Sequence, residues 1–119
     1  TKDLDFSVLS GNDSLILPAL KEGGVGGIAG CSNVYPKVLS SIYELFQEGK
    51  LDEAQAAQDS IASFRAVFKY GNPNTVVKTA VAMLGYNVGK CRAPFNQLPQ
   101  EGLEALEKVL QENKDKGMC

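Results

Sequence analysis

The fold is decided by residues 6–31, which read FSVLSGNDSLILPALKEGGVGGIAGC. Residues 6–10 combine aromatic and β-branched side chains and are followed by the turn formers Gly, Asn and Asp at 11–13. This pattern predicts a short buried strand that ends in a turn. A strand of this apolar kind is typical of a parallel sheet that is covered on both faces.

A short helix is predicted next, over residues 14–22, because most of these residues are apolar and the segment stops at two glycines. Asn12 or Asp13 would be its N-cap, since both side chains accept hydrogen bonds from the first N–H groups of a helix. Pro18 lies inside the segment and lacks a backbone donor. We therefore expect this helix to be bent or short.

Residues 25–31 predict a second short strand, in which glycine marks a close approach of the backbone or a bend. The order strand, helix, strand is typical of an α/β fold. Two strands do not form a sheet of useful stability by themselves. The first third of the sequence is therefore interpreted as one piece of a larger parallel sheet.

The rest of the sequence predicts helices, because its apolar residues recur at three- and four-residue steps. Glycines and prolines mark the ends of these segments. The predicted helices cover residues 36–47, 51–70, 76–84 and 103–110, and residues 86–99 are predicted to form a loop.

Composition excludes several classes of function. The 119 residues carry 12 lysines and arginines against 14 aspartates and glutamates, a net charge of −2 with a pI of about 5.1. This balance argues against a general nucleic-acid binder, which usually has a basic stripe. No apolar stretch approaches the roughly 20 residues needed to cross a bilayer. The length suits one domain with a modest core.

The sequence contains no histidine, which removes the most common general base, the Ser-His and Cys-His nucleophile pairs and most zinc sites. Cys31, Cys91 and Cys119 are odd in number and lack CxxC spacing, so we expect reduced thiols and a cytoplasmic location. The first residue is Thr1 rather than Met. We expect that processing or fragmentation has removed a segment upstream of it.

Several short motifs occur in an order that resembles a known family. They are Ser10-Gly11-Asn12-Asp13, Gly26-Gly27-Ile28, Asn33-Val34 with Pro36, Asn72-Pro73 with Val77-Lys78, and Arg92-Ala93-Pro94. In this order and spacing they resemble the C-terminal portion of the dihydrodipicolinate synthase and N-acetylneuraminate lyase family of pyruvate-dependent class I aldolases. The resemblance covers about residues 6–110.

The resemblance implies the C-terminal part of a (β/α)8 barrel, followed by a C-terminal helical bundle. Residues 6–10 would be the seventh barrel strand and residues 26–30 the eighth, so that residues 1–49 hold the last two strand–helix units. Residues 50–119 would form the bundle. The N-terminal half of the same barrel would be a partner, and a homotetramer is expected. In such barrels the active site lies at the carboxyl ends of the strands.

The family works by Schiff-base chemistry. A lysine on the sixth strand attacks pyruvate, a tyrosine on the fifth relays protons, and a Gly-Thr/Ser-Thr/Ser-Gly-Glu stretch helps to bind the pyruvate carboxylate. The resemblance implies that all of these lie upstream of Thr1. No catalytic residue, metal ligand or cofactor is therefore assigned to this sequence, which we expect to be inactive alone.

The lysines present are not predicted to replace the Schiff-base lysine, because that amine needs a desolvated pocket that lowers its pKa. They precede the first strand or lie on helices and loops: Lys2, Lys21, Lys37, Lys50, Lys69, Lys78 and Lys90. Lys78 lies in a family motif, and we interpret it as a helix-surface residue or a member of an interhelical ion pair.

The resemblance assigns substrate-binding roles to four residues. Backbone groups near Gly11 and Ile28 would approach the substrate, and Asn12 and Asp13 would line the place of the aldehyde. Glycine suits a position that the substrate must approach closely. From the residues alone, the segment 11–13 also fits a plain turn with an N-cap, and this alternative stays open.

The predicted function is the C-terminal half of a Schiff-base lyase that is similar to dihydrodipicolinate synthase, which condenses pyruvate with aspartate semialdehyde in lysine biosynthesis. One alternative is a sugar-acid aldolase, such as an N-acetylneuraminate or 2-keto-3-deoxy acid lyase. The sialic-acid lyases carry Glu and Ser where this sequence has Ser14 and Gly30. The other alternative is a non-catalytic half-barrel that acts as an assembly module.

Overall fold

The computed structural model describes residues 4–95 and 97–118. Lys2 and Cys119, for which predictions are given above, lie outside the described residues. The chain divides into two compact units. The first contains Thr1–Ser32 and Pro36–Ile61, and the second contains Asn33–Tyr35 and Ala62–Cys119.

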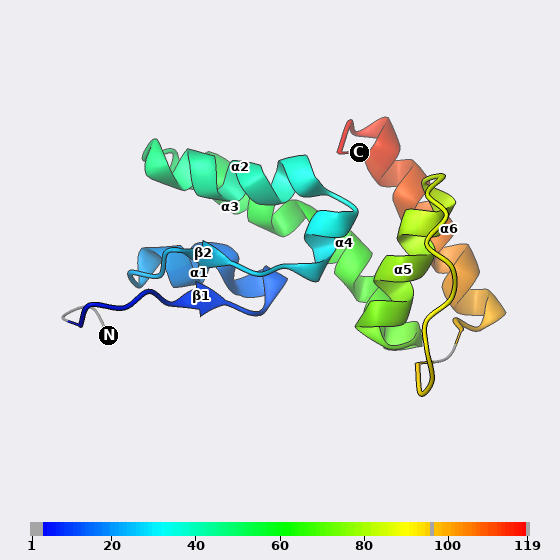
Figure 1. Cartoon of the computed structure of the whole chain (residues 1–119). Coiled ribbons are helices and arrows are strands. Elements are labelled where there is room, and N and C mark those ends of the chain that lie inside the picture. Colours follow the sequence, from blue (N-terminus) through cyan, green and yellow to red (C-terminus); the bar gives the residue numbers. More distant parts are fainter. Residues whose placement is uncertain (1–3, 96, 119) are drawn as a thin grey trace. The chain divides into compact units, whose positions relative to one another are not determined.

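The first unit is built on two parallel strands, β1 (Leu9–Ser10) and β2 (Gly26–Gly27), in which Leu9 pairs with Gly26 and Ser10 with Gly27 (Figure 1). Backbone hydrogen bonds continue the pairing on both sides, from the Val25 N–H to Val8 O at 2.9 Å and from the Ile28 N–H to Ser10 O at 2.8 Å. The predicted strands are confirmed in place, but regular pairing covers only the last part of the first and the start of the second.

The connection after β1 begins as a 3₁₀ turn, η1 (Asp13–Leu15), and continues as α1 (Ile16–Lys21). Asn12 is the N-cap, because its Oδ1 accepts hydrogen bonds from the Ser14 N–H at 3.0 Å and the Ser14 hydroxyl at 2.7 Å. The predicted helix is thus confirmed and is short. Since α1 starts at Ile16, Pro18 falls in its first turn, where the missing N–H removes no intrahelical bond.

Two longer helices complete the first unit, α2 (Pro36–Gln47) and α3 (Leu51–Ser60), which lie side by side (Figure 1). Gly49 joins them with a φ of 78°, a conformation that favours glycine. The predicted single helix over residues 51–70 is wrong, because α3 ends at Ser60 and the chain passes into the second unit after Ile61. The first unit therefore includes α3. The predicted boundary after residue 49, between barrel and helical bundle, refers to a complete barrel protein and stays a prediction.

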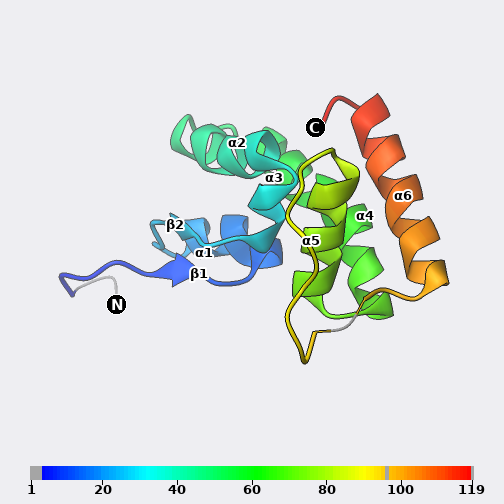
Figure 2. The ribbon, with the colours of Figure 1, turned by 45° about the vertical axis from the view of Figure 1, so that its right-hand side comes forward.

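The second unit is helical. It contains a short helix α4 (Ala62–Arg65), a 3₁₀ segment η3 (Ala66–Tyr70), and the longer helices α5 (Pro73–Met83) and α6 (Gln100–Asp115), which contact each other (Figure 2). The last two predicted helices are confirmed, and both begin three residues earlier than the apolar spacing indicated. Asn72 caps α5 by accepting from the Asn74 N–H at 2.9 Å, and Pro73 occupies the first helical position.

A buried polar pair lies in the aromatic core of the second unit. The ring of Tyr35 meets the ring of Phe64 edge to face, with centroids 5.4 Å apart, and both side chains are fully buried. The Asn113 side-chain amide donates a 2.8 Å hydrogen bond to the Tyr35 hydroxyl oxygen. Asn113 is only 1% exposed, so the Tyr35 hydroxyl compensates for the burial of this amide.

The hydrogen bond between Asn113 and Tyr35 leads to a prediction about the stability of the protein. Tyr35→Phe leaves the buried Asn113 amide without its acceptor, and we expect it to lower the free energy of unfolding by about 1–3 kcal/mol. Tyr43→Phe is the matched control, because Tyr43 is 44% exposed on α2 and its change should stay within about 0.5 kcal/mol. Urea unfolding followed by circular dichroism measures both variants. Equal losses would contradict the role given to the Tyr35 hydroxyl.

Candidate functional site

The candidate site lies at the carboxyl ends of β1 and β2. The two strands are parallel, so the turn at residues 11–13 and the residue after β2, Ile28, leave the sheet at the same edge. The 2.8 Å hydrogen bond from the Ile28 N–H to Ser10 O fixes this arrangement. The structure therefore brings the four predicted site residues together at one edge, while their predicted roles toward a substrate stay predictions.

Asp13 links the two loops of this edge. Its side chain is 8% exposed, and its Oδ2 accepts a 2.9 Å hydrogen bond from the Cys31 N–H, in the loop after β2. Its backbone oxygen accepts a 2.7 Å hydrogen bond from Gln58 Nε2. A carboxylate held by a backbone N–H positions the loops strongly, because charged acceptors form the stronger hydrogen bonds.

Gln58 was missed by the sequence analysis, although it completes this link. It lies on α3, is 6% exposed, and accepts a 3.0 Å hydrogen bond from the Leu17 N–H while it donates to Asp13 O. One side chain thus joins α3 to the start of α1 and to the 11–13 turn. The available signal was its place between Ala54 and Ile61 in an apolar stripe, where an amide has to find internal partners.

Asn12 and Gly11 differ from Asp13 because both are exposed. The Oδ1 atom of Asn12 is occupied by its capping bonds to Ser14. Gly11 faces open space, since a Cβ added to it would meet no atom of the described residues within 4 Å. Packing inside this chain therefore gives no reason for glycine at position 11.

Gly27 gives the opposite result. A Cβ at Gly27 would lie 3.0 Å from Ile16 Cγ1 and 3.3 Å from Ser10 O, because α1 packs closely against β2. A Cβ at Gly24 would lie 2.8 Å from Ala19 O. The expectation that glycine in the predicted strand 25–31 marks a close backbone approach is confirmed at Gly27, whereas Gly24 lies before that strand.

Exposed apolar side chains surround the two strands. Ile28 is 71% exposed and Phe6 is 56% exposed. We call this set the open apolar strip, and it consists of Leu4, Phe6, Val8, Leu9, Val25 and Ile28. A folded protein seldom leaves so many large apolar residues uncovered in neighbouring segments.

The structure also bears on two of the lysines considered above, Lys50 and Lys78. The pKa of Lys50 is raised because its ammonium group donates to the Glu48 carboxylate, 3.2 Å away, on the exposed turn between α2 and α3. A Schiff-base lysine needs the opposite shift, so Lys50 does not suit that role. Lys78 forms no ion pair within the described part of the chain, which does not support the interhelical ion pair considered for it.

Residues 4–95 and 97–118 hold no group of three or more Cys, Asp or Glu side chains arranged to bind a metal ion. None of their helices combines the length and the apolar character that a membrane crossing requires.

Comparison with known proteins gives a family match. The sequence model of the dihydrodipicolinate synthetase family matches residues 1–113. Among curated proteins, the 4-hydroxy-tetrahydrodipicolinate synthases of Methanoculleus marisnigri and Methanospirillum hungatei are 41% and 39% identical to the chain over 111 residues. These alignments cover 92% of the chain and 38% of each relative, so the chain spans well under half of their length.

Solved structures agree with this match. A 4-hydroxy-tetrahydrodipicolinate synthase of Methylacidiphilum fumariolicum superposes with a TM-score of 0.85 and 35% identity, over 94% of this chain and 37% of that one. A dihydrodipicolinate synthase of Bacillus anthracis gives 0.83 and 33%, over 90% and 37%. A variant of the 2-keto-3-deoxygluconate aldolase of Sulfolobus solfataricus gives 0.83 and 27%, over 94% and 39%.

The link through Asp13 makes a prediction. Asp13→Ala removes the acceptor of the buried Cys31 N–H, and we expect it to lower the free energy of unfolding by about 2 kcal/mol. The Cys31 thiol, which is fully buried, should also react faster with a thiol reagent under native conditions, as measured by peptide mapping. Asp5→Ala, at an exposed position, is the control and should change neither quantity. An unchanged Cys31 reactivity in Asp13→Ala would argue against the link.

Proposed function

This chain belongs to the dihydrodipicolinate synthetase family, and from that premise we propose that it forms the last two strand–helix units of a (β/α)8 barrel and the helical bundle that follows them. The whole protein is a pyruvate-dependent Schiff-base lyase. The partial coverage of its relatives supports this reading, since the chain matches about 38% of their length. Two short parallel strands also make an incomplete sheet.

The open apolar strip is the single observation that carries the proposal. Burial of one large apolar side chain contributes about 1.5–3 kcal/mol, so the strip represents a large unused driving force for association. Further strands on both sides of β1 and β2 would satisfy the outer backbone groups of both strands, and the interior and outer helices of a barrel would cover the apolar side chains on the two faces of the sheet. A closed barrel supplies such neighbours and leaves no free sheet edge.

In the proposed reaction, a lysine of the upstream strands attacks the pyruvate carbonyl, and loss of water gives an imine. Deprotonation of the methyl group gives an enamine carbon that attacks the aldehyde. This chain supplies the aldehyde side of the site. The Asp13 carboxylate holds the 11–13 turn in place by accepting a hydrogen bond from the Cys31 N–H. The exposed residues Gly11, Asn12 and Ile28 line the place where the aldehyde binds.

Aspartate semialdehyde is the proposed aldehyde, because the relatives at 39% and 41% identity are named 4-hydroxy-tetrahydrodipicolinate synthases. We also propose that the protein acts in lysine biosynthesis, in the cytoplasm, as a homotetramer. A sugar-acid aldolase is the second candidate, favoured by the likeness to the 2-keto-3-deoxygluconate aldolase variant at a TM-score of 0.83. Turnover of pyruvate with aspartate semialdehyde or with glyceraldehyde distinguishes the two.

Borohydride trapping tests the Schiff base. The protein that carries this chain is incubated with pyruvate and sodium borohydride, and peptide masses are then mapped. We expect a reduced pyruvate adduct on one lysine outside residues 1–119, and none when pyruvate or borohydride is omitted. A folded protein that stays unmodified would contradict the lyase and would favour the non-catalytic assembly module.

The proposed role of Gly11 makes a second prediction. Gly11→Ala adds a Cβ that meets no atom of the described residues within 4 Å, so the packing within this part of the protein should not change. If the aldehyde approaches this backbone, its KM should rise about tenfold, which corresponds to about 1.4 kcal/mol, while pyruvate trapping persists. Gly26→Ala is the matched control, since its Cβ makes only an ordinary contact with Leu9, 3.5 Å away. An unchanged KM in Gly11→Ala would remove Gly11 from the substrate site.

A further inference from the structure

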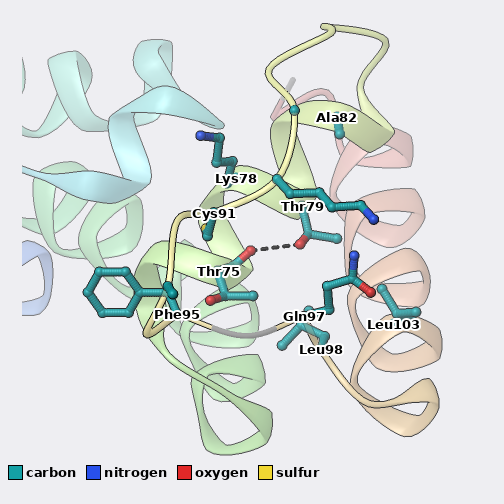
Figure 3. Close-up of a pocket in the computed structure, with 12 residues that line it drawn as sticks. Thr75, Lys78, Thr79, Ala82, Cys91, Phe95, Gln97, Leu98 and Leu103 are labelled. Carbon is teal, nitrogen blue, oxygen red and sulfur yellow. Dashed lines mark hydrogen bonds between the residues drawn. The ribbon is translucent and has the colours of Figure 1, made fainter.

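A cavity lies within the second unit, and none of the residues proposed for the lyase site lines it. It has a volume of about 520 Å³, which is within the range of small-molecule sites. One side is formed by α5, and another by the segment that precedes α6 (Figure 3). Its lining residues are Thr75, Lys78, Thr79, Ala82, Gly89, Lys90, Cys91, Ala93, Phe95, Gln97, Leu98 and Leu103.

The charge of this lining has one sign. Lys78 and Lys90 contribute two ammonium groups, and the lining contains no aspartate or glutamate. Within residues 4–95 and 97–118, neither lysine is paired with a carboxylate. In Figure 3 the Lys78 side chain stems from α5 and its ammonium group points away from Thr75 and Leu103, so it reaches the pocket through a change of side-chain rotamer. The pocket is therefore electropositive and attracts anions.

Thr75 supplies a polar group inside the pocket. Its side chain is 4% exposed, and its hydroxyl oxygen has no hydrogen-bond partner in the part of the chain that the structure describes. The neighbouring Thr79 hydroxyl is already used, because it donates to Thr75 O at 2.7 Å (Figure 3). A buried hydroxyl without a partner costs about 1–3 kcal/mol, so a ligand that pairs with Thr75 would recover this cost.

The remaining walls are largely apolar. Phe95, Leu98 and Leu103 present an aromatic ring and two aliphatic side chains, and Ala82 and Ala93 add methyl groups. An inorganic ion, which has no apolar part, would leave these apolar side chains exposed to water. A ligand with an apolar body would cover them, at about 25 cal/mol per Å² of buried apolar surface.

We propose that this pocket binds a small organic anion, a carboxylate or phosphate group on an apolar or aromatic body. The Lys78 and Lys90 ammonium groups hold the anionic group, the Thr75 hydroxyl forms a hydrogen bond with the ligand, and Phe95 and Leu98 cover its body. The site is separate from the proposed lyase function, because every residue in it belongs to the second unit and none lies at the strand ends.

Phenyl phosphate and benzoate are the probes, because each joins an anion to an aromatic ring. Calorimetric titration of the whole protein measures affinity, and protection of the Cys91 thiol from alkylation, read by peptide mapping, locates the ligand at the pocket that Cys91 lines. We expect at least one probe to bind and to protect Cys91. The other probe's result shows which anionic group the site prefers. Equal binding of neutral phenol, equal binding of inorganic phosphate, or no binding at millimolar concentration would overturn the proposal.

Substitutions connect binding to these residues. Lys78→Gln and Lys90→Gln should each lower the affinity for the probe by up to about fivefold, which corresponds to the loss of one exposed ion pair. Lys108→Gln is the matched control, since Lys108 is exposed on α6 and does not line the pocket. An equal effect of Lys108→Gln would show nonspecific attraction and would overturn the assignment.

Thr75→Val separates binding from structure. Removal of a buried unpaired hydroxyl should leave the Tm of the free protein unchanged or higher, while the affinity for the probe falls about fivefold. If the hydroxyl had a structural partner, the Tm would fall and the affinity would not change, which would contradict the role given to Thr75. Retained Cys91 protection at saturating probe confirms that the variant still folds.

Discussion

The carboxylate of Asp13, buried in the turn that follows β1, connects the loops at the two strand ends of the first unit. Only two residues of each strand pair regularly, so the ladder contributes few hydrogen bonds. Asp13 accepts from the Cys31 N–H beyond β2 and, through its backbone oxygen, from Gln58 on α3. Gln58 in turn accepts from the Leu17 N–H in α1. These three bonds connect both strand ends with two helices, and they explain why the loops of such a small sheet adopt one defined arrangement.

Local patterns foretold much of this architecture and failed where a partner lies far along the chain. Pro36 and Gly49 predicted the two ends of α2 correctly, because their effects on the backbone are local. Pro73 was interpreted only as a stop signal, whereas it is the first residue of α5. The strand positions followed from turn formers in the same way. Gln58 was missed because its partner Asp13 lies 45 positions earlier, beyond the reach of periodicity. The end of α3 was missed for a similar reason, since the apolar spacing continues through Ile61 while the chain changes unit there.

The residues of the candidate site fall into two groups. Contacts within the described part of the chain account for some of them and do not account for the others. Gly27 is required by the close approach of Ile16, and Asp13 by its backbone partners. Gly11 and the exposed Ile28 have no such internal reason. The motif order indicated the candidate site residues, but it did not reveal that Asp13 among them is largely occupied by structural hydrogen bonds. That distinction depends on burial and hydrogen-bond geometry, which composition and spacing do not contain.

The assignment of Asn33–Tyr35 to the second unit, between two segments of the first, constrains how such proteins recombine. The Tyr35 ring contacts Phe64, and its hydroxyl accepts from Asn113, so the second unit is discontinuous in sequence. A genetic crossover at any point between Pro36 and Ile61 would join Tyr35 of one parent to the helices of the other. The chimera would be well packed only if the residue at Tyr35 from one parent is compatible with the residues at Phe64 and Asn113 from the other.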